Sequence, residues 1–474
     1  MKILYAASEA LPFIASGGLA DVAGSLPAAL KKEGAECRVV MPLYGDIKPE
    51  LREKMRYVTH FNVPLAWRNQ YCGLFEAEAN NVKYYLLDNE YYFKRSGIYG
   101  FYDDAERFVF FSKAILEMLT KIDYAPDIIN CNDWQTAMVP VFLNVYYRSI
   151  EKFRGIRTVF TIHNIAYQGK YGMEIATDIA GLPDYALPIV EYDHNVNMMK
   201  GAIDQSDVVS TVSPTYAEEI LDSWFGFGLD RILREKRYKL CGILNGIDVK
   251  SYDPATDPEI YKNYTVKTAK DKGINKAELQ KQMGLNVEPD KPLVAMVSRL
   301  VGMKGLDLVR YIFDSMIAEG IQFVVLGTGD YIYENFFAEM AARYPGTVAV
   351  RKGFVPDLAR KIYAGADILL MPSKSEPCGL AQMVALRYGT IPIIRETGGL
   401  KDSIQDLGGE KGNGYTFKTY NAHDMLGAVK RAVGLYRNPD LWQDAVCHAM
   451  ECDFSWQRSA KKYMEMYQRV LGMG

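Results

Sequence analysis

The chain of 474 residues lacks several features that would place it in a broad class of protein. It has no run of about 18 uncharged apolar residues, so we expect no membrane-spanning segment and no membrane partner. Glu9 and Pro12 interrupt the apolar stretch near the N-terminus, which is therefore not expected to be a signal peptide. The 55 basic and 58 acidic side chains nearly balance, at a net charge of -3, and this argues against a nucleic-acid partner.

Redox and metal-binding patterns are missing as well. The 7 cysteines are scattered, odd in number and without a C-x-x-C pair, which is typical of reduced thiols in a cytoplasm. The 5 histidines form no H-E-x-x-H motif, and no D-x-D motif occurs to hold a metal diphosphate. The fingerprints G-x-G-x-x-G and G-x-x-x-x-G-K-[ST] are also absent. We therefore expect a cytoplasmic protein with no metal and no cofactor.

The chain does contain a regular alternation of strand and helix patterns. In its first half, short β-branched runs are each followed by a helical pattern. The predicted strands are Lys2–Ala7, Cys37–Pro42, Lys83–Leu87, Asp127–Cys131, Thr158–Ile162, Val208–Val212 and Leu240–Leu244, and the predicted helices are Leu19–Lys32, Ala105–Thr120, Gln135–Tyr147 and Thr215–Asp222. Such alternation predicts a parallel sheet covered by helices on both faces.

A charged interval, 253–291, separates this series from a second one. The interval is poor in strand formers and contains the breakers Pro258 and Pro289, so the pattern is expected to pause there. The second series has predicted strands at Pro292–Val297, Gln322–Leu326, Thr347–Val350, Asp367–Met371 and Ile391–Ile394, and predicted helices at Leu306–Glu319, Asp330–Tyr344, Leu380–Tyr388 and Ala422–Tyr436. A final helical pattern covers Trp456–Val470. The prediction is an α/β protein with two doubly wound, Rossmann-like domains.

Residues that follow strands are the candidates for chemistry, because ligands bind doubly wound sheets beyond the carboxyl ends of the strands. Gly17 and Gly18 open the first helix, where bare backbone N–H groups could meet an anion. Arg299 and Lys304 follow the first strand of the second series and could neutralise a diphosphate without a metal. Glu376, in the loop before another helix, could accept hydrogen bonds from sugar hydroxyls.

His163 and Asp133 also stand at predicted strand ends in the first half. Taken singly, each candidate has an ordinary explanation: a turn at a helix start, a solvated charge pair, a helix-entry carboxylate or a structural histidine. Together they gather Gly, Asp, His, Arg, Lys and Glu at successive strand ends, which chance would not readily produce.

Ordered motifs along nearly the whole chain resemble those of bacterial glycogen synthases and plant starch synthases. They are Ser8-Glu9-x-x-Pro12, Gly17-Gly18-Leu19-Ala20-Asp21-Val22, Asn132-Asp133-Trp134-Gln135-Thr136, Thr161-Ile162-His163-Asn164, Gly242 to Asp248, Ser298-Arg299-Leu300 with Lys304-Gly305, Glu376-Pro377-Cys378-Gly379-Leu380, Thr397-Gly398-Gly399-Leu400 and Phe454-Ser455-Trp456. The resemblance implies the GT-B fold of family GT5: an acceptor-binding domain at 1–245, a nucleotide-sugar-binding domain at 246–455, a deep cleft between them, and a C-terminal helix within 456–474 that returns to the first domain.

The resemblance also implies the reaction: transfer of glucose from ADP-glucose to the non-reducing end of an α-1,4-glucan, glycogen or a maltooligosaccharide, with retention of configuration. The implied catalytic residues are His163, Glu376, Arg299 and Lys304. The implied donor-binding residues are Gly17, Gly18, Asn245, Arg299, Lys304, Phe354, Glu376, Cys378, Gly379 and Leu380, with Phe354 stacking on adenine, and the implied acceptor-binding residues are Asp21, Asp133 and Tyr167. The family is thought to use front-face attack, with the diphosphate taking the acceptor proton.

One position departs from the family pattern. The family has a lysine two positions before the Gly-Gly pair, and this chain has Ala15. Losing a cation beside a diphosphate removes a contact worth roughly 1.5–3 kcal/mol, or about ten- to over a hundredfold in rate when only the transition state uses it. A slower enzyme, a compensating cation such as Lys374 or Arg395, and an altered substrate preference are all compatible with this change.

Two other functions are therefore considered as alternatives to the leading one. The first is a low-activity or non-catalytic paralogue that binds glucan, which Ala15 suggests. The second is a GT-B transferase that uses a UDP-sugar; such enzymes often carry a second glutamate eight residues after the first, where this chain has Val384. The sequence leaves the oligomeric state open.

Overall fold

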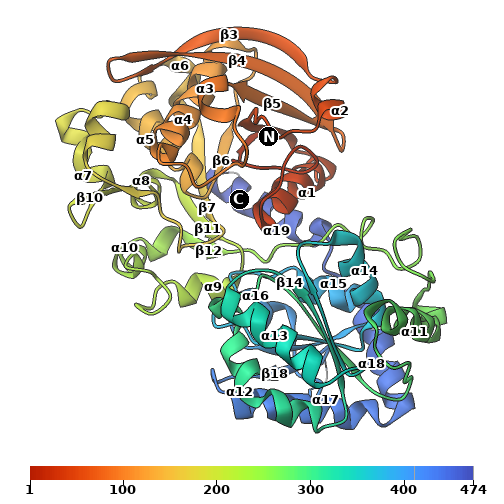
Figure 1. Ribbon diagram of the computed structural model, residues 1–474. Coiled ribbons are helices and arrows are strands. Elements are labelled where there is room, and N and C mark those ends of the chain that lie inside the picture. Colours follow the sequence, from red (N-terminus) through yellow and green to blue (C-terminus); the bar gives the residue numbers. More distant parts are fainter. Residues whose placement is uncertain (410, 473–474) are drawn as a thin grey trace. The chain divides into compact units, whose positions relative to one another are not determined.

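The computed structural model describes residues 1–409 and 411–472 and divides into two compact units. Unit 1 comprises Met1–Asn245 together with the segment that begins at Trp456, and unit 2 comprises Gly246–Ser455 (Figure 1). Among the described residues, no helix combines the length and the apolar character needed to cross a membrane. Each unit is built on one large sheet, so each is an α/β unit in its own right.

The unit 1 sheet has nine strands in the order β12-β11-β7-β6-β1-β2-β5-β4-β3. The parallel strands are β1 (Lys2–Ala6), β2 (Glu36–Pro42), β5 (Val82–Asp88), β6 (Ile128–Asn132), β7 (Arg157–Ile162), β11 (Val208–Thr211) and β12 (Leu240–Gly242). An antiparallel hairpin, β3 (Arg56–Leu65) and β4 (Arg68–Ala79), joins at β5. Because β1 lies between β2 and β6, the order of the strands reverses there, and the loops after β1 and β6 border the switch point where ligands bind such sheets.

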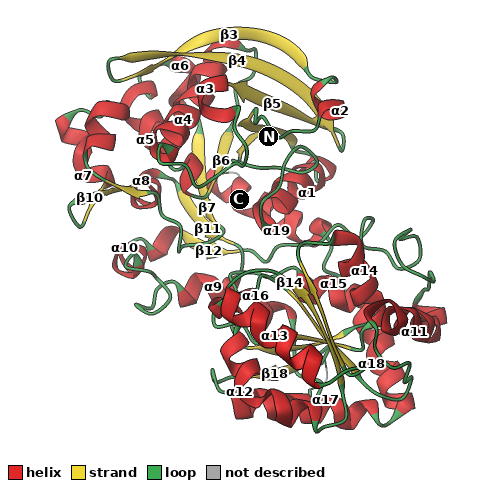
Figure 2. Cartoon of the chain, viewed as in Figure 1, coloured by secondary structure: helices red, strands yellow, loops and turns green. Residues whose placement is uncertain are grey.

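Helices cover this sheet, with one small extra sheet beside them (Figure 2). They are α1 (Gly18–Lys32), α2 (Pro49–Arg52), α3 (Glu90–Phe93), α4 (Asp104–Lys121), α5 (Met138–Phe142), α6 (Glu151–Arg154), α7 (Leu187–Val190), α8 (Met198–Gln205), α9 (Pro214–Glu219), α10 (Asp230–Glu235) and α19 (Trp456–Val470). The small sheet consists of β8 (Lys170–Tyr171), β9 (Glu191–Tyr192) and β10 (Asn195–Asn197).

Helix α19 belongs to unit 1 although it follows unit 2 in the sequence. It packs against α1 and buries one face of apolar and aromatic side chains, namely Trp456, Ala460, Tyr463, Met466 and Tyr467. The Ser459 hydroxyl donates to the carbonyl of Leu244 (2.6 Å), and the Tyr467 hydroxyl donates to Oδ1 of Asn130 in β6 (2.9 Å). The last helix is therefore a structural part of the first unit.

The unit 2 sheet is fully parallel, in the order β15-β14-β13-β16-β17-β18. Its strands are β13 (Leu293–Val297), β14 (Gln322–Gly327), β15 (Val348–Lys352), β16 (Ile368–Met371), β17 (Ile391–Arg395) and β18 (Tyr415–Phe417). Its helices, which lie on both faces (Figure 2), are α11 (Lys272–Met283), α12 (Leu306–Ile317), α13 (Tyr331–Arg343), α14 (Pro356–Gly365), α15 (Ala381–Arg387), α16 (Gly398–Ser403), α17 (Ala422–Tyr436) and α18 (Pro439–Glu451). The strand order reverses between β13 and β16, so a second switch point lies where these two strands end.

Several regions differ from the sequence prediction, which did not include the antiparallel hairpin β3–β4, the small sheet, β18 or α18. Two further differences have a physical reason in the structure. Helix α11 forms inside the charged interval 253–291, because several of its polar side chains are buried and hydrogen-bonded: Nζ of Lys272 donates to the carbonyl of Ala364 (2.8 Å) and to Oγ1 of Thr390 (2.7 Å). The helix predicted over Gln135–Tyr147 divides into a 3-10 turn, α5 and a π-helical segment, Leu143–Tyr147. Pro140, inside α5, has no N–H to donate, so a continuous α-helical ladder could not form there.

Candidate active site

The loop between β1 and α1 places Gly17 and Gly18 at an exposed helix start. The buried carboxylate of Glu9 supports this loop by accepting the backbone N–H of Ser16. Burial raises the pKa of Glu9, while the N–H groups of Ser16 and Gly17 act in the opposite direction. A buried acceptor at this place fixes the loop and leaves the N–H groups at the start of α1 accessible to a ligand.

Asp133 and His163 meet at the ends of the adjacent strands β6 and β7. Oδ1 of Asp133 accepts the backbone N–H of His163 (2.7 Å) and, at 3.3 Å, that of Asn164. Burial raises the pKa of Asp133 to about 7, and the two N–H groups oppose this rise. The carboxyl group therefore holds the His163 loop in place, a structural contact that the sequence prediction did not include.

The His163 ring lies against the amide of Asn132, with Nε2 2.8 Å from Oδ1. Oδ1 of Asn132 also accepts the Tyr5 hydroxyl of β1 at 2.9 Å. Burial lowers the pKa of His163 to about 3, so the imidazole is neutral at physiological pH. A neutral imidazole offers a hydrogen bond and carries no charge to neutralise a phosphate.

The other residues predicted in unit 1 have contrasting environments. Burial raises the pKa of Asp21, in the first turn of α1, to about 6. Tyr167 is 59% exposed, as an aromatic side chain that contacts a sugar chain can be. Asn245 is buried, and its Oδ1 has no hydrogen-bond partner among the described residues.

In unit 2, the turns that follow β13 and β16 bring Lys304 and Glu376 together. Nζ of Lys304 lies 2.6 Å from Oε2 of Glu376, and the hydroxyl of Ser373 donates to the same oxygen (3.0 Å). A cavity of about 160 Å³ opens at this point. Its lining includes Ser298, Arg299, Lys304, Ser373, Glu376, Gly379 and Leu380. The predicted cations, the predicted carboxylate and part of the Gly379-Leu380 segment therefore share one small cavity.

Two glycines make this convergence of turns sterically feasible. Gly305 follows Lys304 with φ of +74°, and a Cβ there would lie 2.0 Å from the carbonyl oxygen of Pro372. Gly398, with φ of +44°, likewise leaves no room for a Cβ beside the carbonyl oxygen of Glu376 (2.0 Å). Positive φ values and such close approaches between backbones are tolerated by glycine. The Lys304 turn and the start of α16 thus pack directly on the loop that carries Glu376.

Arg395, one of the two cations considered as a replacement for the family lysine, has a different role in the structure. It is 8% exposed at the end of β17, and its guanidinium donates to the backbone carbonyls of Ser373 (Nε, 2.8 Å) and Lys374. Arg395 therefore supports the Glu376 loop. The ammonium of Lys374, the other candidate, lies 5.8 Å from the ring centroid of Tyr420.

The remaining predicted donor residues lie near the carboxyl edge of the unit 2 sheet. Phe354, two residues after β15, is 89% exposed, so the face of its ring can stack on a planar base. Cys378 is buried between Glu376 and Gly379 in the loop that precedes α15. Within the described residues, no group of three or more His, Cys, Asp or Glu side chains is placed to hold a metal ion.

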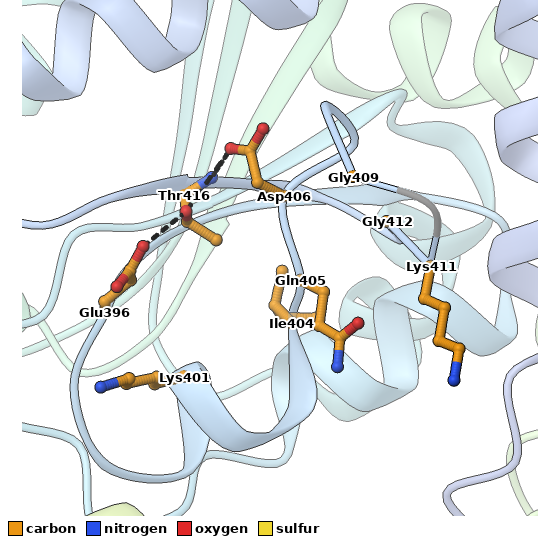
Figure 3. A pocket seen from close by; sticks show the side chains of 9 residues that line it. All are labelled: Glu396, Lys401, Ile404, Gln405, Asp406, Gly409, Lys411, Gly412 and Thr416. Atoms are coloured by element: carbon orange, nitrogen blue, oxygen red, sulfur yellow. Dashed lines mark hydrogen bonds between the residues drawn. The ribbon is translucent and has the colours of Figure 1, made fainter.

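A larger and more open pocket of unit 2, about 580 Å³, contains none of the predicted residues (Figure 3). It is lined by Glu396, Lys401, Ile404, Gln405, Asp406, Gly409, Lys411, Gly412 and Thr416. Two of its polar groups already bind each other, since the hydroxyl of Thr416 donates to Oε1 of Glu396 (2.9 Å). The smaller cavity beside Glu376 is therefore the candidate active site. It is chosen for the chemical groups that line it rather than for its size.

Comparison with known proteins identifies the family. Residues 2–235 match a family model described as the starch synthase catalytic domain, and residues 278–440 match one described as glycosyl transferases group 1. The glycogen synthase of Geobacillus thermodenitrificans is 50% identical over 475 residues, which cover 99% of this chain and 98% of that protein. The chain belongs to the glycogen synthase and starch synthase family. The glycogen synthase of Desulforamulus reducens is also 50% identical, over the full length of both chains.

Solved structures agree with this family and its fold. The catalytic domain of starch synthase IV from Arabidopsis thaliana, bound to ADP and acarbose, is 34% identical, covers 99% of both chains and superposes with a TM-score of 0.92. A sucrose-phosphate synthase from Thermosynechococcus elongatus, at 15% identity and a TM-score of 0.61, shares the fold alone. The GT-B fold and the family resemblance predicted from the motifs are confirmed, and the protein is a glycosyltransferase of this family.

The sequence prediction missed the residues that hold this family's site in shape. Glu9 and Asn132 stand within motifs of the family resemblance, but no structural role was predicted for either, and Arg395 was considered only as a compensating cation. Their position beside a motif was the available signal, because support groups for a loop tend to come from neighbouring strand ends. Which group each side chain binds depends on strand order, and this was not visible in the motifs.

Proposed function

We propose that this protein transfers the glucosyl group of ADP-glucose to the non-reducing end of an α-1,4-glucan, glycogen or a maltooligosaccharide, with retention of configuration. The observation that carries the proposal is the Lys304–Glu376 pair beside Arg299 in one cavity at the switch point of unit 2. Membership of the family supports the reaction class. The cavity supports a role for unit 2 in binding a charged sugar donor.

The donor's diphosphate is assigned to Arg299 and Lys304. The Lys304 ammonium uses one of its three N–H groups on Glu376, so the other two are available to phosphate oxygens. Charge-assisted hydrogen bonds of this kind are about twice as strong as neutral ones, and they strengthen as the leaving group gains charge. The pair of cations therefore stabilises the departing ADP more than the bound substrate.

The glucose of the donor is assigned to the Glu376 loop. Oε2 of Glu376 accepts from Lys304 and Ser373, which leaves Oε1 to accept hydrogen bonds from sugar hydroxyls. Backbone groups of the neighbouring segment, with the N–H groups of α1 and the Asn245 amide, complete the proposed donor contacts: Gly17, Gly18, Asn245, Cys378, Gly379 and Leu380. Phe354 is proposed to stack on the adenine.

The acceptor glucan is assigned to unit 1, through Asp21, Asp133 and Tyr167, with His163 beside the reacting sugar. We propose front-face attack: the 4-hydroxyl oxygen of the acceptor bonds to C1 of glucose as the C1–O bond to the diphosphate breaks. The hydroxyl proton passes to an oxygen of the leaving diphosphate, so no carboxylate nucleophile is needed. The proposal includes no cofactor and no metal. It also includes a cytoplasmic location, which the lack of disulfides among the described cysteines supports.

A donor panel tests the proposal. Purified protein is incubated with glycogen and ADP-glucose, UDP-glucose or GDP-glucose, with and without a chelator, and release of the nucleoside diphosphate is measured. We expect ADP release that the chelator does not change, and a loss of about 100-fold or more in Glu376→Ala, which removes two charge-assisted contacts. Glu339→Ala, an exposed glutamate on α13, is the matched control and should be unaffected. No ADP release above the Glu376→Ala level would contradict the proposal, and a preference for UDP-glucose would favour the alternative transferase, although Val384 stands where such enzymes often carry a second glutamate.

Ala15 supports a second candidate, a low-activity protein that binds glucan. Ala15 is exposed and adjoins Ser16, whose N–H is held by Glu9, so a lysine can be introduced there without disturbing the packing. If the active site is impaired, Ala15→Lys should raise kcat by about ten- to a hundredfold with an unchanged Tm. An unchanged or lower kcat would count against the impaired-enzyme candidate and in favour of a site that works without this cation.

A further inference from the structure

His163 has one neighbour that decides which of its ring nitrogens carries the proton. Asn132, the last residue of β6, is fully buried, and its Oδ1 lies 2.8 Å from Nε2 of His163. A hydrogen bond at this distance can run in either direction for an imidazole, depending on the tautomer. The orientation of the Asn132 amide therefore determines the tautomer of His163.

The amide orientation follows from a backbone carbonyl. Nδ2 of Asn132 lies 2.8 Å from the carbonyl oxygen of Ala6 in the adjacent strand β1. A carbonyl oxygen can only accept, so the NH₂ group must face Ala6, and the amide oxygen must face the other way. The buried Tyr5 hydroxyl, which donates to Oδ1 at 2.9 Å, agrees with this orientation. A flipped amide would turn its oxygen toward the Ala6 carbonyl, and two acceptors would then face each other with no hydrogen between them.

The consequence for the imidazole is a defined tautomer. Because Oδ1 only accepts, Nε2 of His163 must carry the hydrogen, and in the neutral ring Nδ1 then holds a lone pair. In the part of the chain that the structure describes, no protein group donates to Nδ1. An imidazole in this state is a hydrogen-bond acceptor that needs a donor from outside the protein.

We propose that Asn132 is a positioning residue: held by the Ala6 carbonyl and Tyr5, it fixes His163 as the Nε2–H tautomer, so that Nδ1 accepts a hydrogen bond from a hydroxyl of the sugar substrate. The inference deepens the proposed function and rests on it for the identity of the hydroxyl donor. The opposite tautomer would place an N–H at Nδ1 and would favour a phosphate or carbonyl oxygen instead. Asn132 thus favours the binding of a hydroxyl group, rather than an anion, at Nδ1 of His163.

Asn130 provides a matched control on the same strand. It is also fully buried and also hydrogen-bonded through its amide, to the Tyr467 hydroxyl (2.9 Å) and Oγ1 of Thr161 (3.0 Å), but it does not contact His163. Asn132→Ser and Asn130→Ser therefore remove similar buried amides two positions apart. A merely structural role predicts similar effects of the two substitutions on activity, whereas the positioning role predicts different ones.

The tautomer itself is measured first, on the full-length wild-type chain with ¹⁵N-labelled histidine. With 5 histidines in the chain, the His163 signals are assigned by their loss in His163→Ala. We expect Nε2 to show the shift of a protonated ring nitrogen and Nδ1 that of an unprotonated one. A protonated Nδ1 would overturn the proposal, and since this measurement requires no turnover, it is independent of the proposed reaction.

Kinetics with ADP-glucose and glycogen then test the link to catalysis. We expect Asn132→Ser to lower kcat by about tenfold, the equivalent of one hydrogen bond made to the substrate, with a smaller change in KM. Asn130→Ser should leave kcat within about twofold at a comparable loss of Tm. In a His163→Ala background, Asn132→Ser should have almost no further effect, because the two residues act as a unit. Equal effects of the two serine variants, or additive effects of Asn132→Ser and His163→Ala, would overturn the proposal.

Discussion

His163 and Asp133 meet at the ends of β7 and β6, and their pKa values are shifted in opposite directions for the same reason. Burial disfavours the charged form of each group, so it lowers the pKa of the imidazole to about 3 and raises that of the carboxyl to about 7. The single contact between them, from the His163 N–H to Oδ1 of Asp133, requires only an acceptor oxygen and no charge. Ionisation of Asp133 is therefore unfavourable for the fold.

This leads to a prediction for Asp133→Asn. Between the unfolded pKa of about 3.9 and the folded pKa of about 7, the native state binds a proton that the unfolded state does not, so the wild-type protein loses stability as pH rises. The variant keeps an acceptor oxygen and lacks this titration. We expect the difference in free energy of unfolding, variant minus wild type, to increase by about 1–2 kcal/mol from pH 4.5 to pH 8. This is less than the full pKa shift would give, because the Asp133 side chain is partly exposed.

Urea titrations of both proteins across this pH range measure the difference. The His163 titration, whose lowered pKa makes stability fall below about pH 6.5, is common to both proteins and cancels in the comparison. A difference that stays constant with pH would show that Asp133 is ionised in the folded protein at low pH.

At the scale of elements, the site of unit 2 depends on how closely the short turn before α12 approaches the loop after β16. Lys374 donates its backbone N–H to the carbonyl of Met303 (2.9 Å), and Gly305 lies against Pro372. These backbone contacts set the distance at which Lys304 meets Glu376. The ion pair is therefore a product of turn geometry as much as of charge.

Gly305→Ala tests this dependence. A Cβ would lie 2.0 Å from the Pro372 oxygen at a backbone φ of +74°, so the turn must move away from the Glu376 loop. We expect a loss of about 2–3 kcal/mol in stability and a fall of at least about tenfold in kcat. Gly302→Ala is the matched control from the same turn, because among the described residues its Cβ would meet only the Tyr333 hydroxyl, at 3.6 Å. Equal losses in the two variants, measured by thermal unfolding and ADP release, would contradict the account.

At the scale of the whole molecule, the chain leaves unit 1 at Asn245 and returns to it at Trp456. Helix α19 contributes buried aromatic side chains to the core of unit 1, and Tyr467 supplies a hydrogen bond to Asn130 in the central sheet. The core of unit 1 is therefore built from two distant parts of the sequence.

Removal of the segment that begins at Trp456 should destabilise unit 1 selectively. The loss of its buried apolar side chains corresponds to on the order of 5 kcal/mol or more. In hydrogen exchange measured by mass spectrometry, we expect protection to fall in α1 and β6 and to be unchanged in β13 and β14. Equal loss of protection in the strands of both units would contradict the assignment of α19 to the core of unit 1.

Much of the fold was predictable because its signals are local. The strand at Thr158–Ile162 and the helix at Trp456–Val470 show the expected apolar runs and periodicity, and both form within a residue of the prediction. Helix α11 could not be predicted in this way, since its buried face carries Lys272, Asn275 and Lys276, whose burial depends on carbonyl acceptors outside the helix, such as that of Tyr363 for Lys272. For the site, the residue types and their positions after strands could be recognised in the sequence. The functional roles of these residues stay predictions.

The sequence by itself determined the family, the two α/β units and the set of chemical groups at the strand ends, because motifs and hydrophobic periodicity are properties of neighbouring residues. Only the tertiary structure decided that Lys304 pairs with Glu376, that Arg395 supports their loop and that the Asn132 amide is oriented by Ala6. Each of these contacts joins residues from different strands or turns, and strand order is set by packing of the whole sheet. The state of His163 follows from that order, since β1 beside β6 supplies the carbonyl that orients the amide.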